Sequence, residues 1–391
     1  MFVTKEQQLW TAATDGDLPT VELLCSDPTV DVNWTSGERM DSPLHRSCRF
    51  GKTPVAVFLL AHPRVDLNLL NNRGCTPFYI ACQEHSTEIV RILMAHPGID
   101  VLHPHRQGHT PFSKSCGQGH LDIVELLLAD PRTDVNHPTD FLMTPFSFAC
   151  QEGMTDVVAR LLRDPRVDVN LRDKWGESPF FVACWQNVDP VIRLLLADPR
   201  IDLDLPNHLG VWPLWVLAHQ GHLSLLQLLL SSGREFDTLR ETPPTMALSG
   251  SKTPAGIARL QVTFELASFE SPEDFTRCWR NCPLIADLLD EYHVAPVAVR
   301  GRLRRLPHIR EPYIARTFAL MVFFADGFLK PSVVEPPGLG DQVLRFLRLA
   351  AKLPLELQML LSHRVFNSGG DIILQKDSES GFRWLVCESS E

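Results

Sequence analysis

The chain has 391 residues, of which 44% are hydrophobic and 21% are charged, and its formal net charge is −10. This composition is ordinary for a folded protein, and the length allows a repeat array together with a second unit. The negative charge disfavours general attraction to nucleic acid or anionic membranes, so we expect neither as a partner. The amino-terminal residues show no basic stretch followed by an apolar core, so we expect no signal peptide. The longest apolar run, residues 318–325, has about half the length of a membrane span and predicts a core helix.

A proline recurs every 34 residues along the first part of the chain. It occupies the positions Pro43, Pro77, Pro111, Pro145, Pro179 and Pro213. An apolar run, a pair of small residues and a stretch rich in Val, Ile and Leu follow each proline. Repetition at this period predicts a stack of short units, none of which can bury its apolar face alone. We therefore expect an all-α solenoid of about seven helix-turn-helix repeats joined by hairpin loops. The first repeat lacks the proline.

One repeat illustrates what each part contributes. Thr76 and Pro77 are suited to cap and to open a first helix. His85 stands where most repeats carry glycine, at a turn that requires a left-handed backbone, and Asn187 suits the same position. A second helix follows, with apolar residues from Ile89 to Leu93 at helical spacing. The second helix then ends at a residue that precedes proline, because proline disfavours the helical conformation of the residue before it.

Cysteine and aspartate also keep the period of the repeat. Five of the ten cysteines are 34 residues apart, namely Cys48, Cys82, Cys116, Cys150 and Cys184. Copies in successive repeats should lie about 10 Å apart, beyond the roughly 7 Å between α-carbons that a disulfide permits. We expect buried, reduced thiols and a cytoplasmic location, with the nucleus as the alternative. The repeated aspartates are expected to fix hairpin turns through backbone amides: Asp66, Asp100, Asp134, Asp168 and Asp202.

The repeated segments are similar to a known motif. SPLHRSC, TPFYIAC, TPFSKSC, TPFSFAC, SPFFVAC and WPLWVLA resemble the ankyrin motif TPLHLAA. The resemblance covers residues 4–236 and implies that hairpins and first helices line a concave face on which the family binds proteins. A proline-containing stop replaces the usual glycine after the second helix. His45 alone keeps the motif histidine, while the other repeats carry Tyr79, Ser113, Ser147, Phe181 and Trp215.

Beyond the array the period is lost. Residues 1–236 are expected to form the array, 237–262 a loop with a truncated eighth repeat at 253–258, and 263–391 a helical domain. Helical spacing marks residues 272–280, 283–292, 297–306, 312–328, 341–352 and 355–365. This region resembles a carboxy-terminal module found in ankyrin-repeat proteins of unicellular eukaryotes, which implies no activity.

Three polar groups admit a functional and a structural interpretation, and in each case we favour the structural one. His103, His105 and His109 crowd one hairpin, where a zinc site competes with ordinary polar tip residues. Cys278 and Cys282 lie on one face of a predicted helix, where they are either a pair of metal ligands or core residues. The third group is a basic cluster that suits phosphate contact, an import signal or the wet face of an amphipathic helix: Arg300, Arg302, Arg304 and Arg305.

Outward positions of the repeats change from polar to aromatic along the array. The predicted partner-binding residues are Phe141, Met143, Gln151, Glu152, Lys174, Trp175, Trp185, Gln186, His208, Leu209 and His219. Exposed aromatic side chains among polar ones are typical of protein-binding hot spots. The alternative is that Trp175 and Trp185 pack on each other, on Trp212 or on Trp215.

The sequence favours a non-enzymatic adaptor that is monomeric, needs no cofactor or metal, and binds a protein or peptide on the concave face of repeats four to six. Phosphate-binding loops and hydrolase motifs are absent from it. One alternative is the substrate-recognition subunit of a ubiquitin ligase, acting through residues 355–365. A catalytic carboxy-terminal domain with Cys278, Cys282, His293 and His308 is a further alternative.

Overall fold

The computed structural model describes residues 3–234, 236–240, 253–261, 272–304 and 306. In these ranges the regular structure is helical apart from one isolated bridge between Ser36 and Asp41, which confirms the predicted all-α class. The chain divides into two compact units, Met1–Pro213 and Leu214–Glu391. The helices predicted at 312–328, 341–352 and 355–365 lie outside the described residues, as do His308 and Arg305. The predicted domain boundaries after residues 236 and 262 stay predictions.

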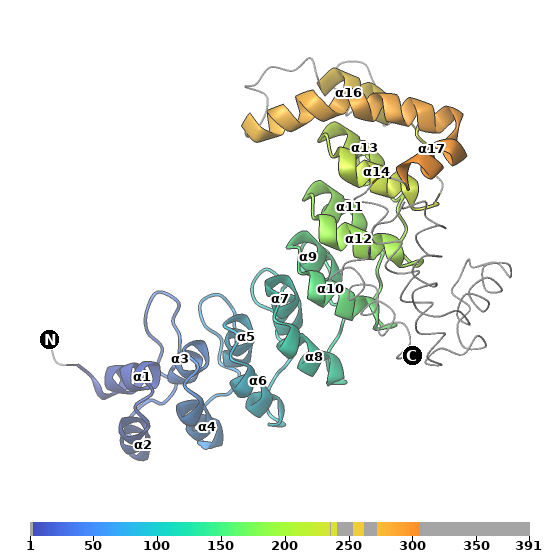
Figure 1. Cartoon of the computed structure of the whole chain (residues 1–391). Helices are drawn as coiled ribbons and strands as arrows, with labels where there is room; N and C mark the ends of the chain where they lie inside the picture. Colours follow the sequence, from blue (N-terminus) through green and yellow to red (C-terminus); the bar gives the residue numbers. More distant parts are fainter. Residues whose placement is uncertain (1–2, 235, 241–252, 262–271, 305, 307–391) are drawn as a thin grey trace, which may run out of the picture. The chain divides into compact units, whose positions relative to one another are not determined.

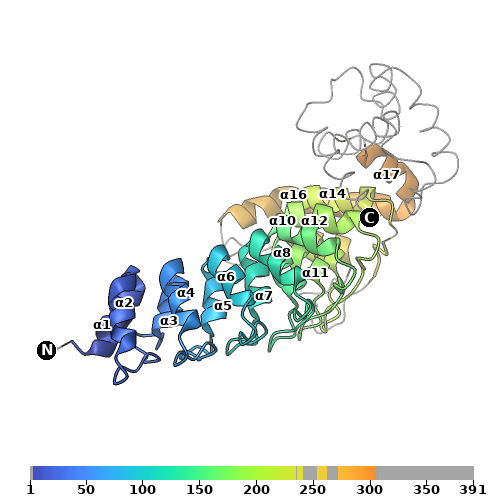
Figure 2. The ribbon, with the colours of Figure 1, turned by 90° about the horizontal axis from the view of Figure 1, so that it is seen from below.

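The first unit is a stack of helix pairs joined by hairpins (Figure 1). Odd-numbered helices contact odd-numbered neighbours and even-numbered helices contact even-numbered ones, so the pairs form two layers (Figure 2). The pairs are α1 Lys5–Asp15 with α2 Leu18–Ser26, α3 Pro43–Arg49 with α4 Thr53–Ala61, α5 Pro77–Gln83 with α6 Thr87–Met94, α7 Pro111–Gln118 with α8 Leu121–Ala129, α9 Pro145–Gln151 with α10 Thr155–Leu162, and α11 Pro179–Trp185 with α12 Asp189–Ala197. We number these pairs as repeats one to six, and the following pair, α13 Pro213–His219 with α14 Leu223–Ser231, as repeat seven.

Local sequence explains where these helices begin and turn. In each of repeats two to six a Ser or Thr side chain accepts a hydrogen bond from the third helical amide, and proline follows it at the first helical position. The turn between the two helices has a left-handed backbone in every repeat with glycine there. His85 and Asn187 replace glycine at φ angles of 56° and 57°, as predicted.

The core consists of equivalent side chains stacked from repeat to repeat. The residue after each proline is buried, namely Leu44, Phe78, Phe112, Phe146 and Phe180. The periodic cysteines Cys48, Cys82, Cys116, Cys150 and Cys184 are free and fully buried, as predicted. Burial disfavours the thiolate and raises the pKa of Cys48 to about 12. These thiols are therefore small packing groups.

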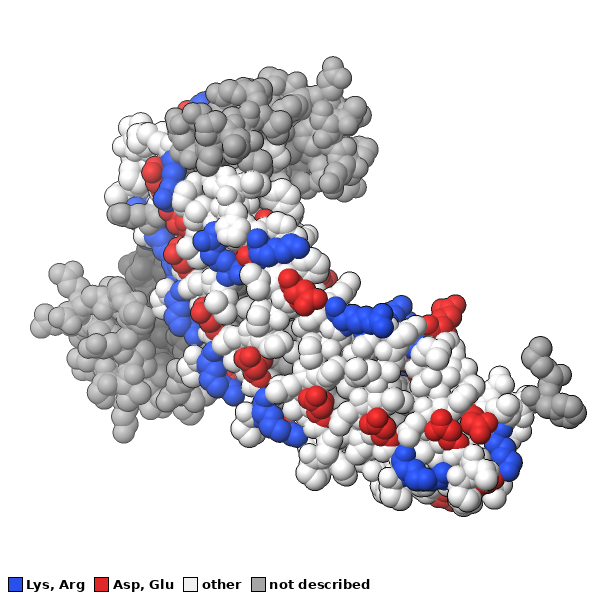
Figure 3. Space-filling view, turned by 180° about the vertical axis from the view of Figure 1, so that it is seen from behind, with Lys and Arg blue, Asp and Glu red and all other residues white. Residues whose placement is uncertain are grey.

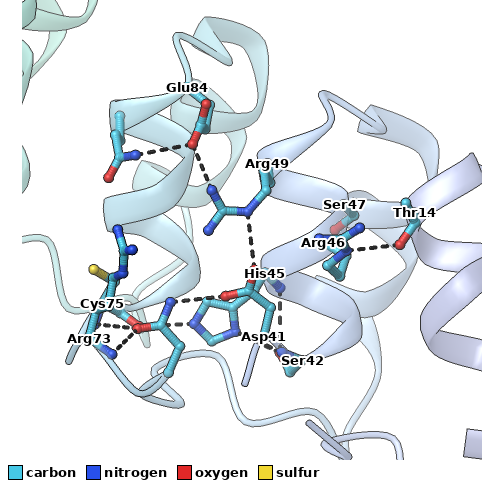
Figure 4. Close-up of polar contacts among 12 residues, drawn as sticks. Thr14, Asp41, Ser42, His45, Arg46, Ser47, Arg49, Arg73, Cys75 and Glu84 are labelled. Carbon is cyan, nitrogen blue, oxygen red and sulfur yellow. Dashed lines mark hydrogen bonds and ion pairs between the residues drawn. The ribbon is translucent and has the colours of Figure 1, made fainter. Parts of the chain in front are cut away.

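The one retained motif histidine connects two repeats (Figure 4). The Nδ1 atom of His45 accepts from Ser42, whose hydroxyl lies 2.8 Å away, while Nε2 lies 3.0 Å from the carbonyl oxygen of Cys75. This arrangement requires the proton on Nε2. Burial lowers the pKa of His45, which keeps the ring neutral. Beside it Arg49 bridges Asp41 and Glu84, so a second polar link joins the same repeats.

The loop after each second helix supplies further links. The aspartates at 66, 100, 134, 168 and 202 each accept from the amide two residues later, which confirms their predicted role. An asparagine two residues beyond such an aspartate reaches the next repeat: Asn136 donates to the carbonyl of Arg166 and accepts from the amide of Asp168. Asn33, Asn68 and Asn170 do the same, whereas the third repeat has Leu102 at this position.

Arginines form a parallel series in the same loops. Arg132, Arg166 and Arg200 each donate to a carbonyl at the end of the preceding repeat's second helix while paired with an aspartate two residues earlier. The equivalent residue of the third repeat is Gly98. Because such residues recur in register, like charges form rows along one face (Figure 3). The third repeat thus lacks both the arginine and the asparagine that link the other repeats to their neighbours.

The second unit begins within α13, Pro213–His219, and continues with α14, Leu223–Ser231, and α15, Pro254–Gln261. It also contains α16, Pro272–Val294, and α17, Pro296–Leu303. The prediction of separate helices at 272–280 and 283–292 is wrong, because α16 runs through Pro283. The helix continues although a proline removes one helical hydrogen bond and its ring crowds the preceding turn.

The described part of the basic cluster serves contacts within the second unit. Arg300 donates to the carbonyl of Gly233 and Arg304 to that of Ser231, at 3.1 and 3.0 Å. Arg302 pairs with Glu291. Val299 and Leu303 on the same helix are buried, but Val297 is exposed and Arg300 is partly buried, so the prediction of an amphipathic helix with the arginines on its solvent-exposed face is not confirmed.

The asparagine series gives a first prediction. Asn136→Ala removes two hydrogen bonds between repeats and should lower the free energy of unfolding by about 1 kcal/mol. Leu102→Ala is the matched control, because its position is equivalent and Leu102 makes no such side-chain bond; it should cost no more than about 0.5 kcal/mol. Urea unfolding followed by circular dichroism measures both. Equal losses in the two variants would contradict a role for the asparagine side chain.

Candidate functional site

The hairpins that precede repeats three to seven share one construction. A polar residue at the start of the tip accepts hydrogen bonds from the amides two and four residues later. Asn71, Thr139, Asp173 and Asn207 do this with a side-chain oxygen, and the Nδ1 atom of His105 accepts from the amide four residues later. Each tip is therefore held in a defined conformation before any partner binds.

Backbone hydrogen bonds connect each tip to the next. The amides of Asn72, Arg106, Asp140, Lys174 and His208 donate to the carbonyls of Arg39, Arg73, Gln107, Phe141 and Trp175, respectively. The N–O distances range from 2.7 to 3.3 Å. We call the six connected tips, residues 37–41, 71–75, 105–109, 139–143, 173–177 and 207–211, the hairpin ridge. Residues at equivalent positions of the ridge are consequently neighbours.

One such position is apolar and exposed in the last three tips. Phe141, Trp175 and Leu209 have 38%, 47% and 49% of their surface exposed. The rings of Phe141 and Trp175 stack with their centroids 5.8 Å apart and their planes 7° apart. The Nζ atom of Lys174 lies 4.0 Å from the Phe141 centroid and 4.8 Å from that of Trp175. Stacking and the cation–π contact fix these side chains while leaving much of their surface accessible.

The predicted residues outside the ridge lie where first helices end. Gln151 and Trp185 are the last residues of α9 and α11, and Glu152 and Gln186 cap these helices. Trp185 is 49% exposed and stacks on Phe181 at a centroid distance of 6.5 Å. Ten of the eleven predicted residues thus belong to the first unit, with Met143 partly buried, while His219 belongs to the second.

A further residue escaped the sequence analysis. Four of the six ridge tips carry glycine with a positive φ at one position, namely Gly74, Gly108, Gly176 and Gly210. Met40 and Leu142 occupy the same position with φ angles of 54° and 59°, a left-handed backbone that is strained for residues with a long side chain. Both are exposed, Leu142 by 52%, and Leu142 adjoins Phe141. Alignment of the repeats on their prolines would have revealed this departure from glycine.

A buried aspartate, Asp173, and a partly buried glutamate, Glu177, lie in the tip that carries Trp175. Asp173 is only 4% exposed, and its Oδ1 accepts from the amides of Trp175 and Glu177 at 2.9 and 2.8 Å. Its Oδ2 is buried and has no hydrogen-bond partner. Burial raises the pKa of Asp173, and burial together with the charge of Asp173 raises the pKa of Glu177. Asn71 and Asn207 make the same backbone bonds without a charge.

Two of the three histidines of the third hairpin, counted from the amino terminus, lie against aromatic rings. His105 stacks on Tyr79 at 5.3 Å, and His109 packs against Phe148 at 4.8 Å. Burial lowers the pKa of His109 to about 4. His103, His105 and His109 are each partly buried, so they are packing residues as well as polar tip residues. Within the described ranges no group of three or more His, Cys, Asp or Glu side chains is placed to hold a metal ion.

Comparison with known proteins agrees with this geometry. A family model described as ankyrin repeats (3 copies) matches residues 9–105, 44–139, 98–173 and 146–240, which together cover more than half of the chain. A search of curated proteins found no match. No helix in the described part of the chain combines the length and the hydropathy that crossing a membrane requires.

The strained residue of the ridge gives a second prediction. Leu142→Gly relieves the left-handed backbone and should raise the free energy of unfolding by about 1 kcal/mol. Leu171→Gly is the control, because Leu171 is also exposed but has no positive φ; glycine there should cost about 0.5–1 kcal/mol. Chemical unfolding of both variants provides the comparison. A loss of stability in Leu142→Gly would show that Leu142 is not strained.

The buried carboxyl of Asp173 gives a third prediction, which depends on pH. Its raised pKa means that the folded chain holds this proton more tightly than the unfolded chain, so its contribution to stability falls as pH rises from about 4 through the folded pKa. Asp173→Asn should therefore stabilise the protein by about 1 kcal/mol at pH 7, and the gain should shrink towards pH 4. The converse change, Asn207→Asp, should lower the free energy of unfolding at pH 7 and should lower it less at pH 4. A gain that is independent of pH would exclude the carboxyl charge as its cause.

Proposed function

Because the chain belongs to the ankyrin-repeat family, whose arrays form protein–protein interaction domains, we propose that it is a non-enzymatic adaptor. It holds a protein or peptide on the face formed by hairpins and first helices, around the tips 139–143, 173–177 and 207–211. The free, buried cysteines of the described residues support the expectation of a cytoplasmic or nuclear protein. We propose that the chain acts as a monomer.

The exposed apolar row of the ridge is the observation that carries the proposal. Phe141, Trp175 and Leu209 stand at equivalent positions of three connected tips, and each exposes more than a third of its surface. Large apolar groups that remain exposed on a folded surface are typical of binding sites. Stacking and the contact with Lys174 hold Phe141 and Trp175 in place, which reduces the entropy lost when a partner orders these two side chains.

The first helices of the same repeats end at polar residues, as expected for the rim of an interface. Gln151 donates to Glu152 at 3.2 Å, and both lie one repeat before Trp185 and Gln186 in equivalent positions. Trp and Tyr dominate the binding energy of many interfaces when polar side chains around them exclude water. Trp175 and Trp185 are therefore the proposed anchors, and the polar set contributes complementarity more than energy.

Affinity capture with the full chain tests the proposal. The variant Trp175→Ala/Trp185→Ala should lose partners that the wild type retains, with affinity reduced by about tenfold or more, because two anchors are removed. The control is Leu23→Ala/Val57→Ala, since both residues are exposed apolar side chains on the even-numbered helices, 71% and 43% exposed. It should keep the partners.

Stability must be compared in the same preparations, because Trp185 also stacks on Phe181. Trp175→Ala alone is the second variant, since Trp175 contacts Phe141 and Lys174 near the surface. Identical partners for the wild type, the double variant and Trp175→Ala, at equal melting temperatures, would exclude this surface as the binding site.

A further inference from the structure

We propose that the hairpin ridge binds one peptide segment of a partner protein, with acidic residues along the tips before repeats two to four and large apolar residues along the tips before repeats five to seven. This inference rests on the proposed function and names the chemistry of the partner. It follows from a change along the ridge from basic to apolar side chains, which appears when equivalent positions of the repeats are compared.

The first half of the ridge is basic, although the whole chain has a net charge of −10. Arg39, Arg73 and Arg106 occupy its tips, and Arg73 and Arg106 are exposed. Unlike Arg49, which is paired with Asp41 and Glu84, these three arginines form no ion pair with an acid of the described ranges. Glu38 is the one exposed acidic residue among the first three tips. Unpaired arginines in a row favour carboxylates of a partner, which they can bind through two parallel hydrogen bonds.

The second half of the ridge is apolar at equivalent positions. Phe141, Trp175 and Leu209 replace Arg39, Arg73 and Gln107 of the first half. Leu142 extends this surface from the position where its neighbours Gly108 and Gly176 carry no side chain. A strained residue in place of glycine costs stability, and Leu142 still leaves 52% of its surface exposed. Met40 shows the same combination in the first tip, so the strain alone does not mark the apolar half, whereas Leu142 adds to the apolar surface that Phe141 begins.

The geometry sets the length of the segment. Successive tips are joined by single backbone hydrogen bonds, and the helices behind them lie about 10 Å apart. The centres of the basic and apolar halves are three tips apart, or roughly 30 Å. An extended chain advances about 3.3 Å per residue, so about nine residues should separate the acidic and apolar groups of the partner.

Panning of a phage-displayed library of random peptides, about 16 residues long, on the full chain tests this. The selected peptides should carry Asp or Glu in one half and Trp, Phe or Leu in the other, and their binding should weaken as salt is added. Arg73→Glu/Arg106→Glu should weaken binding of a selected synthetic peptide by about tenfold or more. The control Arg91→Glu/Arg160→Glu makes the same charge change on α6 and α10 and should alter binding by less than about twofold.

Leu142→Gly separates binding from folding, because it should weaken binding of the peptide by about threefold or more while the melting temperature of the protein rises. Selected peptides without acidic enrichment, or equal effects of the two arginine pairs, would overturn the inference. The proposed function would survive that result if Trp175→Ala still abolished their binding. A library that yields no specific binder, or binders insensitive to both Trp175→Ala and the arginine changes, would contradict the inference and the proposed function together.

Discussion

The first unit depends on the burial of apolar faces between neighbouring repeats. No single helix pair encloses a core, so Phe78, Phe146 and Phe180 become fully buried only because a repeat lies on either side. The periodic cysteines occupy the tightest of these positions, where a small side chain is required and burial suppresses thiolate chemistry. The stability of the first unit is therefore a sum over pairs of neighbouring repeats, and each interface between two repeats contributes separately.

Polar links then determine how one repeat is oriented on the next. The motif histidine makes such a link only at His45. The hairpin backbones are hydrogen bonded to one another along the whole array, and Asn136 and Asn170 connect the loops after the second helices. These bonds also join the repeats around His45, and they keep the later repeats connected without the histidine. The third repeat, with Gly98 and Leu102, has fewer side-chain links of this kind.

Two energetic costs occur in the half of the ridge that carries the exposed aromatic rings. Leu142 holds a left-handed backbone, and Asp173 has a buried carboxyl oxygen without a partner. Both occur at positions where another repeat has a residue without the cost, glycine in one case and asparagine in the other. Departures from local preference often accompany functional surfaces, because folding alone would not retain them. Met40 carries the same left-handed backbone in the first tip, so of the two costs only the buried carboxyl of Asp173 is confined to the half that exposes the aromatic rings.

The sequence by itself determined the helix pairs, their caps, the buried cysteine positions and the turn geometry of His85 and Asn187. These features follow from local hydrogen bonding and from apolar spacing, both of which repeat every 34 residues. The continuity of α16 through Pro283 was not predictable, because a proline weakens a helix without dictating that it ends.

Tertiary structure alone decided which exposed residues meet. Phe141 and Trp175 stack because hydrogen bonds between hairpins bring residues 34 positions apart into contact, and Asp173 is buried because neighbouring tips cover it. Contacts of this kind arise from the packing of whole repeats, which no short stretch of sequence encodes.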